Sequence, residues 1–442
     1  MSTRLRNVEP VETIHVEMET EGALRHVGDI VRRDRVLYFA YDPAFRALGL
    51  ELSPFRMRPG TDLYEGPRGL FDGLHGVFND SLPDGWGRLL LDRKLREGGI
   101  LPGSLTPLDR LAMVGSRGMG ALRYRPEHPQ RARARKPHID LDELAESARL
   151  VLEDDADVVI DHLLALGGSS SGARPKALVG LSADGRRLVH GVDDLAPGFE
   201  HWIVKFRARE DPVDIGAIEH AYALMSQEAG VDMPETALFP SKRGPGHFGI
   251  RRFDREGNRR VHMLTACGLL HADHRMPSIG YVELLKATRL LTRREAEVDR
   301  MFARMVFNVL AHNRDDHTKN HSFVMAEDGT WSVAPAYDVT FSAGPGGYHA
   351  LLVGSDVRDP GIDEIRSVAA AADVRDAVVR ACIDRTLAAV ARWPEFAEAS
   401  GVSRSMLDQV DATINPGRHD PKPRPRGAKS ARKSSKTPSS EA

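Results

Sequence analysis

Hydrophobic and polar residues alternate near the start of the chain and adopt a helical spacing further on. Every second position of 14–18 is apolar, which is the period of a half-buried β-strand. A second apolar run at 36–41 predicts another strand, and an apolar stripe with helical spacing begins at Trp86 and ends near Gly98. We therefore expect a strand-rich N-terminal region over residues 1–128, with a helix embedded in it.

The segment 126–138 has no apolar periodicity and is rich in proline and arginine, so it is the best candidate for a linker. Apolar spacing in 141–152 and 156–166 predicts two helices. A third helix is indicated by apolar residues at Ile218 and at three, four and seven positions beyond it, and Gly230 ends it. Strands are predicted at 176–181, 188–191, 202–206 and 248–253.

From about residue 281 the chain becomes mainly helical, and an apolar face over 302–310 leads to Asn313. We expect a mixed unit at 139–256 and a mainly helical unit at 257–416. No internal repeat is visible. A strand-rich part with one embedded helix, followed by a helical part, is the order of the two lobes of protein kinases. The pattern therefore predicts an α+β, bilobal, kinase-like fold with an extra strand-rich N-terminal subdomain.

Composition fits a soluble globular protein, with 41% hydrophobic and 28% charged residues. The chain has no apolar run of about 18 residues, so we expect no membrane-spanning helix. Its first residues are charged and lack the apolar core of a signal peptide. Cys267 and Cys382 are the only cysteines, which argues against a disulfide framework and against cysteine-bound zinc. A reducing cytoplasm is the expected compartment.

The last segment, 417–442, carries eight Lys or Arg residues and two acidic ones, so its net charge is +6 and residues 1–416 carry −8. It is rich in proline and serine and almost lacks apolar residues, so we expect it to be disordered. Two interpretations stay open. The basic segment could hold nucleic acid through its phosphates, or it could be a solvated end that aids solubility.

The segment Asn313–Asn320 (NRDDHTKN) carries the most specific chemistry. Asp315 and Asn320 are five positions apart, the spacing of a kinase catalytic loop in which an Asp accepts a hydroxyl proton and an Asn holds Mg²⁺. Asp338 follows at the place of a metal-holding Asp. Carboxylate and amide oxygens suit Mg²⁺. We predict Asp315 as the catalytic base, with Asn320 and Asp338 as metal ligands.

Two other interpretations of this segment remain. Asp and Asn are common in polar loops that cap helices. Alternatively, His312, Asp316 and His317 could bind the metal of a hydrolase, although no second His and carboxylate cluster with zinc-protease spacing supports this. The set His271, Asp273 and His274 is a weaker metal candidate, because two His three positions apart are common on helices by chance.

Lys205 lies in a predicted strand between apolar residues. Such a lysine often points to solvent. However, the helix that follows carries Glu219, so the kinase pairing of a strand Lys with a helix Glu is available. We predict that Lys205 binds the α- and β-phosphates of ATP. Glu228 is a rival partner on the same helix, and Lys319 is a further candidate for phosphate contact.

The stretch 167–176 (GGSSSGARPK) has the composition of a phosphate-binding loop. It is not a Walker A motif, because Ala173 rather than Lys follows Gly172. Its backbone N–H groups could still bind phosphate, and the alternative is a flexible linker. The predicted contacts are Ser169, Ser170, Ser171 and Gly172.

These segments together resemble the HipA family of serine/threonine kinases, the toxins of bacterial toxin–antitoxin modules. The resemblance covers most of residues 12–370. The motifs that carry it are FNDSLPDGWG at 78–87, GGSSSGARPK at 167–176, WIVK at 202–205, RFDR at 252–255, NRDDHTKN at 313–320 and Tyr337-Asp338. The GARPK form of the loop differs from that of the best-known member.

The resemblance implies ATP and Mg²⁺ as cofactors and gives Asp315, Asn320, Asp338 and Lys205 the roles described above. It also implies further positions. The stretch containing Arg251 and Phe253 is similar to the one whose backbone meets adenine, with Arg251 where the well-known member has an acidic residue. Ser169 falls at the family's autophosphorylation site, and Ser170 and Ser171 lie close enough to be confused with it.

The resemblance implies partners as well. Such proteins bind a helix-turn-helix antitoxin of HipB type, which dimerises, represses its own operon and so brings operator DNA to the toxin indirectly. Known substrates of the family include aminoacyl-tRNA synthetases, whose phosphorylation leads to growth arrest and persistence. Two rival functions remain: a catalytically silent corepressor that acts with an antitoxin on DNA, and a kinase for small molecules or lipids on a related fold.

Overall fold

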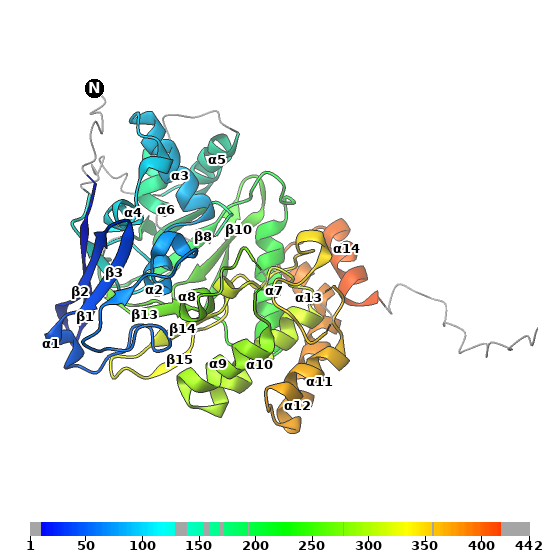
Figure 1. The fold of residues 1–442 in the computed structure, drawn as a ribbon. Helices are drawn as coiled ribbons and strands as arrows, with labels where there is room; N and C mark the ends of the chain where they lie inside the picture. The colour runs from blue at the N-terminus through cyan, green and yellow to red at the C-terminus, as the bar shows by residue number, and fades with distance from the viewer. Residues whose placement is uncertain are drawn as a thin grey trace, which may run out of the picture.

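A computed structural model describes most of the chain. The described ranges are 10–128, 139–153, 160–167, 172–192, 194–276, 278–355 and 358–416. The predicted linker beyond residue 128, the three serines at 169–171 and the basic segment 417–442 lie outside them. Figure 1 shows a strand-rich N-terminal part at one edge of the molecule, a second sheet in the middle, and helices α11 to α14 at the opposite edge.

The N-terminal sheet has five antiparallel strands in the order β4-β3-β2-β1-β5. The predicted alternation is confirmed in β1, where Ile14, Val16 and Met18 are buried. A helix begins just before Trp86, also as predicted. The bounds of this part are β1 Thr13–Thr20, β2 Ala23–Arg33, β3 Val36–Tyr41, α1 Pro43–Arg46, β4 Tyr64–Glu65, η1 Phe71–Gly73, α2 Gly76–Asn79, α3 Gly85–Glu97, η2 Pro102–Ser104, α4 Pro107–Val114 and β5 Arg123–Arg125.

The middle sheet is also antiparallel, in the order β7-β6-β8-β10-β9. The strands predicted at 176–181 and 188–191 are present as β6 and β7, and the two pair antiparallel. The strand predicted at 248–253 was misplaced, because β10 ends at Arg251 and the chain then turns. The bounds are α5 Leu141–Leu152, α6 Ile160–Gly167, β6 Lys176–Ser182, β7 Leu188–His190, β8 Phe199–Lys205, α7 Ile215–Glu228, β9 Thr236–Ser241, β10 Gly244–Arg251, β11 Arg255–Glu256 and β12 Arg259–Arg260.

The last part is mainly helical, as predicted, but it also contains a three-stranded sheet that the pattern did not reveal. Its strands are only three or four residues long. The bounds are β13 His262–Thr265, α8 Ala266–Leu270, α9 Tyr281–Thr292, α10 Glu295–Leu310, η3 Thr318–Asn320, β14 Ser322–Met325, β15 Trp331–Val333, η4 Pro345–Gly347, α11 Ile362–Ala371, α12 Asp376–Ala391, α13 Trp393–Ala399 and α14 Arg404–Ile414.

One apolar core joins the N-terminal sheet to the helical part. Val16 and Phe39 from the sheet belong to the same buried cluster as Leu285 from α9 and Phe302 from α10. The contact between α2 and α8 is very close: a Cβ at Gly76 would lie 2.2 Å from the carbonyl oxygen of Gly268. The limits of the domains stay predictions. The shared core holds the N-terminal sheet against the helical part, because exposing this apolar surface to water would be costly.

Two expectations about the chain as a whole can be compared with the structure. None of the described helices is both long and apolar enough to cross a bilayer. Cys267 and Cys382 are both buried, and neither is joined in a disulfide in this structure.

Candidate active site

The end of α10 delivers the segment 313–320 to the middle of the molecule. Asn313 fixes the start of this segment, because its backbone N–H donates to the Asn308 carbonyl at 2.8 Å and its side-chain nitrogen donates to the Asn308 amide oxygen at 3.0 Å. The same nitrogen lies 3.3 Å from the carbonyl oxygen of Asp338. One buried amide therefore joins the loop that carries Asp315 to the segment that carries Asp338.

Asp315 and Asn320 are linked directly. The Asn320 side-chain nitrogen donates to the Asp315 carbonyl at 2.7 Å, which leaves the Asn320 amide oxygen as the atom suited to a cation. The Asp315 side chain is 59% exposed. Its pKa lies above the ordinary value, because partial burial raises it and the nearby Asp338 carboxylate also raises it, against the lowering effect of His317. A carboxylate with a raised pKa is better suited to accept a proton.

Lys205 is the last residue of β8, and its ammonium group lies between two carboxylates. It contacts the Glu219 carboxylate from α7 on one side and the Asp338 carboxylate on the other. Lys205 and Glu219 are only 10% and 3% exposed. Burial alone would lower the pKa of Lys205, but Asp338 and Glu219 outweigh it and hold the pKa above the ordinary value. Burial would likewise raise the pKa of Asp338, but Lys205 and Lys176 keep it well below its usual range.

The structure thus brings Lys205, Glu219, Asp315, Asn320 and Asp338 to one place through four separate segments. The predicted pairing of Lys205 with Glu219 is present. The rival partner, Glu228, lies near the far end of α7 and pairs with Arg392 at 2.7 Å.

Asp316 is a structural residue. Its side chain is fully buried, and it accepts hydrogen bonds from the Tyr281 hydroxyl at 2.7 Å and the Ala350 N–H at 2.9 Å, while His349 Nδ1 lies 3.0 Å away. These contacts hold the segment after Asp338 against α9. Asp316 therefore has no oxygen directed toward the site.

The alternative metal sites do not form. In the described residues, the one group of His, Cys, Asp or Glu side chains close enough to share an ion is His15, His26 and Asp29, which are on β1 and β2. The set at 312–317 that a hydrolase would use is not such a group, and neither is the set His271, Asp273 and His274.

The described part of the phosphate loop begins at Gly172, and the serines at 169–171 lie outside it. The Gly172 N–H donates to the Asp84 carboxylate. Arg174 pairs with Asp211 at 3.1 Å. Lys176 is buried, and its pKa is lowered because burial outweighs the nearby carboxylates.

A cavity of about 270 Å³ opens beside this loop. Its lining includes Arg174, Lys205 and Glu219, but none of Asp315, Asn320 and Asp338. The cavity therefore reaches the part of the candidate site formed by Lys205 and Glu219, and not the part formed by Asp315, Asn320 and Asp338.

The predicted adenine-contact residues lie at the end of β10. Arg251 is exposed and pairs with Glu200 at 3.1 Å, and its N–H donates to the Glu235 carbonyl at 2.9 Å. Phe253 stacks on Tyr337, with ring centroids 5.6 Å apart. Phe253 therefore lies next to the segment that carries Asp338, and its contact with adenine stays a prediction.

The residues on either side of Phe253, Arg252 and Asp254, form a buried ion pair at 2.7 Å. Asp254 also accepts a hydrogen bond from the Gly120 N–H at 2.8 Å. The RFDR motif thus ties the turn after β10 to the N-terminal region, which is a structural role that its spacing did not indicate.

Lys319 is largely buried, and its Nζ lies 2.5 Å from Asp84 Oδ2. Phosphate contact by Lys319 stays a prediction. Asp84 belongs to the FNDSLPDGWG motif, for which the sequence alone predicted no chemistry. The carboxylate in that motif is the signal that could have pointed to this contact.

We expect Asp315→Ala and Asp316→Ala to affect stability very differently. Removing the Asp316 carboxylate leaves several buried donors without an acceptor, at about 1–3 kcal/mol each, so its free energy of unfolding should fall by about 3 kcal/mol or more. The Asp315 change should stay within about 0.5 kcal/mol, since that side chain is largely exposed. Urea unfolding of both variants measures this, and equal midpoints would contradict the structural role of Asp316.

Comparison with known proteins bears on the fold and the family of the chain. The family model described as the HipA N-terminal domain matches residues 21–125, and the HipA-like C-terminal domain matches residues 168–393. A solved structure titled as the HipA, HipB and operator DNA complex of the Shewanella oneidensis MR-1 toxin–antitoxin system aligns over 90% of this chain and 95% of that chain. Its TM-score is 0.63 at 15% sequence identity. That likeness confirms the predicted fold class.

Two curated relatives are named as kinases. "Putative kinase Y4dM" of Sinorhizobium fredii is 28% identical over 48% of this chain and 56% of its own length. A "Putative kinase" of Haemophilus influenzae is 26% identical over 35% of this chain and 49% of its own length. The alignments therefore span about half the length of these relatives. Because the HipA-like C-terminal model alone matches more than half of the residues, the chain belongs to the HipA family.

Proposed function

We propose that this chain is an ATP- and Mg²⁺-dependent protein serine/threonine kinase, and that it acts as the toxin of a toxin–antitoxin pair in the cytoplasm. The observation that carries the proposal is the position of the Lys205 ammonium between Glu219 and Asp338, next to the Asp315–Asn320 loop. This is the arrangement of charges that phosphoryl transfer needs.

The donor set fits a magnesium ion. Asp338 offers a carboxylate with a depressed pKa, and Asn320 offers an amide oxygen, both hard ligands of the kind that Mg²⁺ prefers. When bound, Mg²⁺ neutralises charge on the β- and γ-phosphates of ATP. Asp338 would then exchange its contact with Lys205 for the ion, and Lys205 would bind phosphate oxygens while still held by Glu219.

Asp315 would orient the acceptor. Its exposed carboxylate would accept a hydrogen bond from a serine or threonine hydroxyl and take up the hydroxyl proton as the new O–P bond forms and the bond from the γ-phosphorus to the leaving ADP oxygen breaks. The raised pKa of Asp315 favours this transfer, and the same group would be inactive once protonated at low pH.

We expect Asp315→Ala to lower γ-phosphate transfer by about 10²–10⁴-fold, because the acceptor hydroxyl loses both its orientation and its proton acceptor. Transfer from radiolabelled ATP to a generic protein substrate and to the chain itself measures this. Equal incorporation by the wild type and the variant would remove Asp315 as the base. Absence of transfer by the wild type, with ATP bound, would favour the silent corepressor instead.

A matched pair of variants controls this experiment. Glu219→Gln weakens the hold on Lys205 and should raise the KM for ATP by about tenfold, which corresponds to about 1.4 kcal/mol. Glu228→Gln makes the same chemical change on the same helix, away from the site, and should leave the KM unchanged.

We propose an aminoacyl-tRNA synthetase as the acceptor, on the basis of the family resemblance. A panel of synthetases, small-molecule alcohols and lipids, each incubated with radiolabelled ATP, separates protein phosphorylation from the rival kinase classes.

We further propose that Ser169 is autophosphorylated. A phosphate there adds about −1.5 to −2 charges to the loop and would repel ATP. After incubation with Mg-ATP, phosphopeptide mapping should find the phosphate on Ser169, and Ser169→Ala should lack it, while Ser170→Ala and Ser171→Ala keep it. Phosphate on none of the three serines would disprove this.

Finally, we propose a helix-turn-helix antitoxin as partner, by likeness to the HipA fold that was solved with HipB and DNA. A small helix-turn-helix protein encoded beside this chain should co-elute with it in size-exclusion chromatography and carry operator DNA into the complex. Separate elution of the two proteins at micromolar concentration would argue against the partnership.

A further inference from the structure

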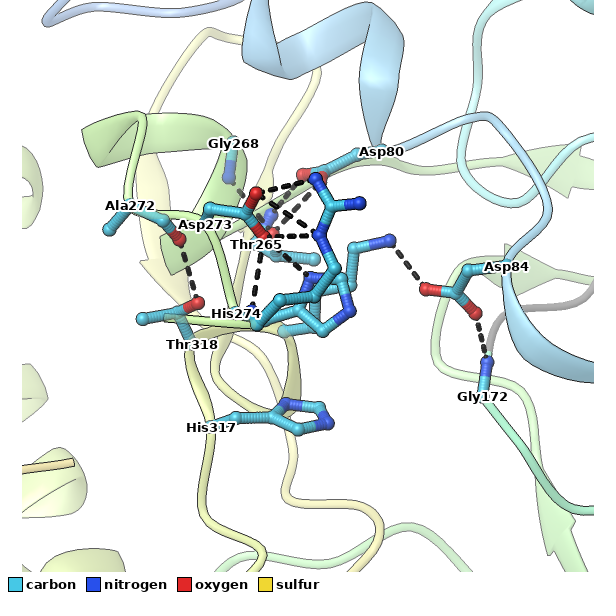
Figure 2. Close-up of polar contacts among 12 residues, drawn as sticks. Asp80, Asp84, Gly172, Thr265, Gly268, Ala272, Asp273, His274, His317 and Thr318 are labelled. Atoms are coloured by element: carbon cyan, nitrogen blue, oxygen red, sulfur yellow. Dashed lines mark hydrogen bonds and ion pairs between the residues drawn. The ribbon is translucent and has the colours of Figure 1, made fainter. Parts of the chain in front are cut away.

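The FNDSLPDGWG motif places a carboxylate from the N-terminal region between two functional loops. Asp84 is the residue before helix α3, where an Asp commonly caps the helix, yet its side chain makes no capping hydrogen bond. Instead, one oxygen accepts the Gly172 N–H of the phosphate loop and the other lies 2.5 Å from Lys319 Nζ of the catalytic loop. Figure 2 shows the Asp84 carboxylate reaching toward Gly172 on one side and a lysine ammonium on the other.

The backbone around Asp84 is fitted to the phosphate loop. The Trp86 N–H donates to the Gly172 carbonyl at 3.0 Å, so the two segments exchange hydrogen bonds in both directions. Gly85 has a φ of +41°, and a Cβ there would lie 2.5 Å from the Gly172 oxygen and 2.7 Å from the Ala173 Cα. Only glycine permits both the conformation and this close approach.

Asp84 is the carboxylate that pairs with Lys319, and Asp80 adds a weaker charge compensation. The Lys319 side chain is 10% exposed and the Asp84 side chain 24% exposed, and a buried ammonium without a counter-charge is costly. Burial would raise the pKa of Asp84, but Lys319 lowers it below the ordinary value, so the carboxylate is ionised. The neighbouring Asp80 is directed elsewhere, because it accepts the N–H and hydroxyl of Thr265 at 2.8 and 3.0 Å, and burial raises its pKa to about 6.

The two partners of Asp84 lie at key points of the proposed site. Lys319 directly precedes Asn320, the proposed metal ligand, in the same 3₁₀ turn. Gly172 is the first described residue after the loop serines. A single carboxylate therefore sets the distance between the loop that would hold the metal and the loop that would hold the phosphates.

We propose that Asp84 is a positioning residue for phosphoryl transfer, through which the N-terminal region holds the phosphate loop and the catalytic loop in register. This inference rests on the proposed kinase function. It means that the N-terminal region helps to set the geometry of the active site. Asp84 acts through Lys319 and Gly172, and it does not itself contact the reacting atoms.

Two variants separate the two halves of the contact. Asp84→Ala removes both, so we expect a rise of about tenfold in the KM for ATP and a fall of about tenfold in kcat, the size expected for misplacement of catalytic groups. Asp84→Asn keeps an oxygen for the Gly172 N–H but loses the charge that holds Lys319. It should lower kcat with a smaller change in KM, a split that a general loss of stability would not produce.

Asp92→Asn is the matched control. Asp92 lies on α3 and pairs with Arg110 at 3.2 Å, away from both loops. The variant loses a partly buried carboxylate of the same helix, so it should keep the wild-type kcat and KM even if its melting temperature falls.

A readout that needs no catalysis separates this inference from the kinase proposal. Hydrogen–deuterium exchange of full-length protein should show faster exchange in the peptide covering 172–176 in Asp84→Ala, and unchanged exchange in Asp92→Asn. If the wild type transfers no phosphate, this measurement still decides the positioning role. Unchanged exchange and unchanged KM in both Asp84 variants would overturn the proposal, whether or not the enzyme is active.

Discussion

The site depends on one buried ammonium group, that of Lys205, held between Glu219 and Asp338. A lysine at the end of a central strand would not stay charged there without both carboxylates, because desolvation favours its neutral form. The helix α7 must therefore pack on β10 so that Glu219 faces the strand, and the turn at Asp338 must return to it. The packing of the middle sheet, of α7 and of the segment after β15 together brings Lys205 into contact with Glu219 and Asp338.

A second set of contacts joins the N-terminal region to the same centre. Asp84 meets both functional loops, and the Arg252–Asp254 pair accepts the Gly120 N–H. Each is a charged or polar contact in a place with little water, where geometry is held more firmly than at the surface. The N-terminal region is thus attached to the site through directional bonds as well as through the shared apolar core.

Local patterns predicted much of this molecule, and long-range packing explains what they missed. The five-residue spacing of Asp315 and Asn320 and the strand-then-helix order of Lys205 and Glu219 are local features, and both contacts are present. The strands β13 to β15 are too short to show a period. Asp84 and Lys319 are 235 positions apart, so no local rule could pair them. The roles of Asp315, Asn320 and Asp338 toward metal and phosphate remain predictions.

The glycine contact between α2 and α8 limits how this architecture can change. A Cβ at Gly76 would meet the backbone of Gly268, and a Cβ at Gly268 would meet the Asp80 carboxylate, so neither position can accept a larger side chain unless its neighbours move. This contact lies only a few residues from Asp80 and Asp84. Moving α2 away from α8 would therefore also displace the FNDSLPDGWG motif, which contacts the phosphate loop and the catalytic loop. Substitutions at Gly76 and Gly268 should therefore accumulate slowly in evolution. Joining a foreign N-terminal module to the helical part would require redesigning both sides of the α2–α8 contact together.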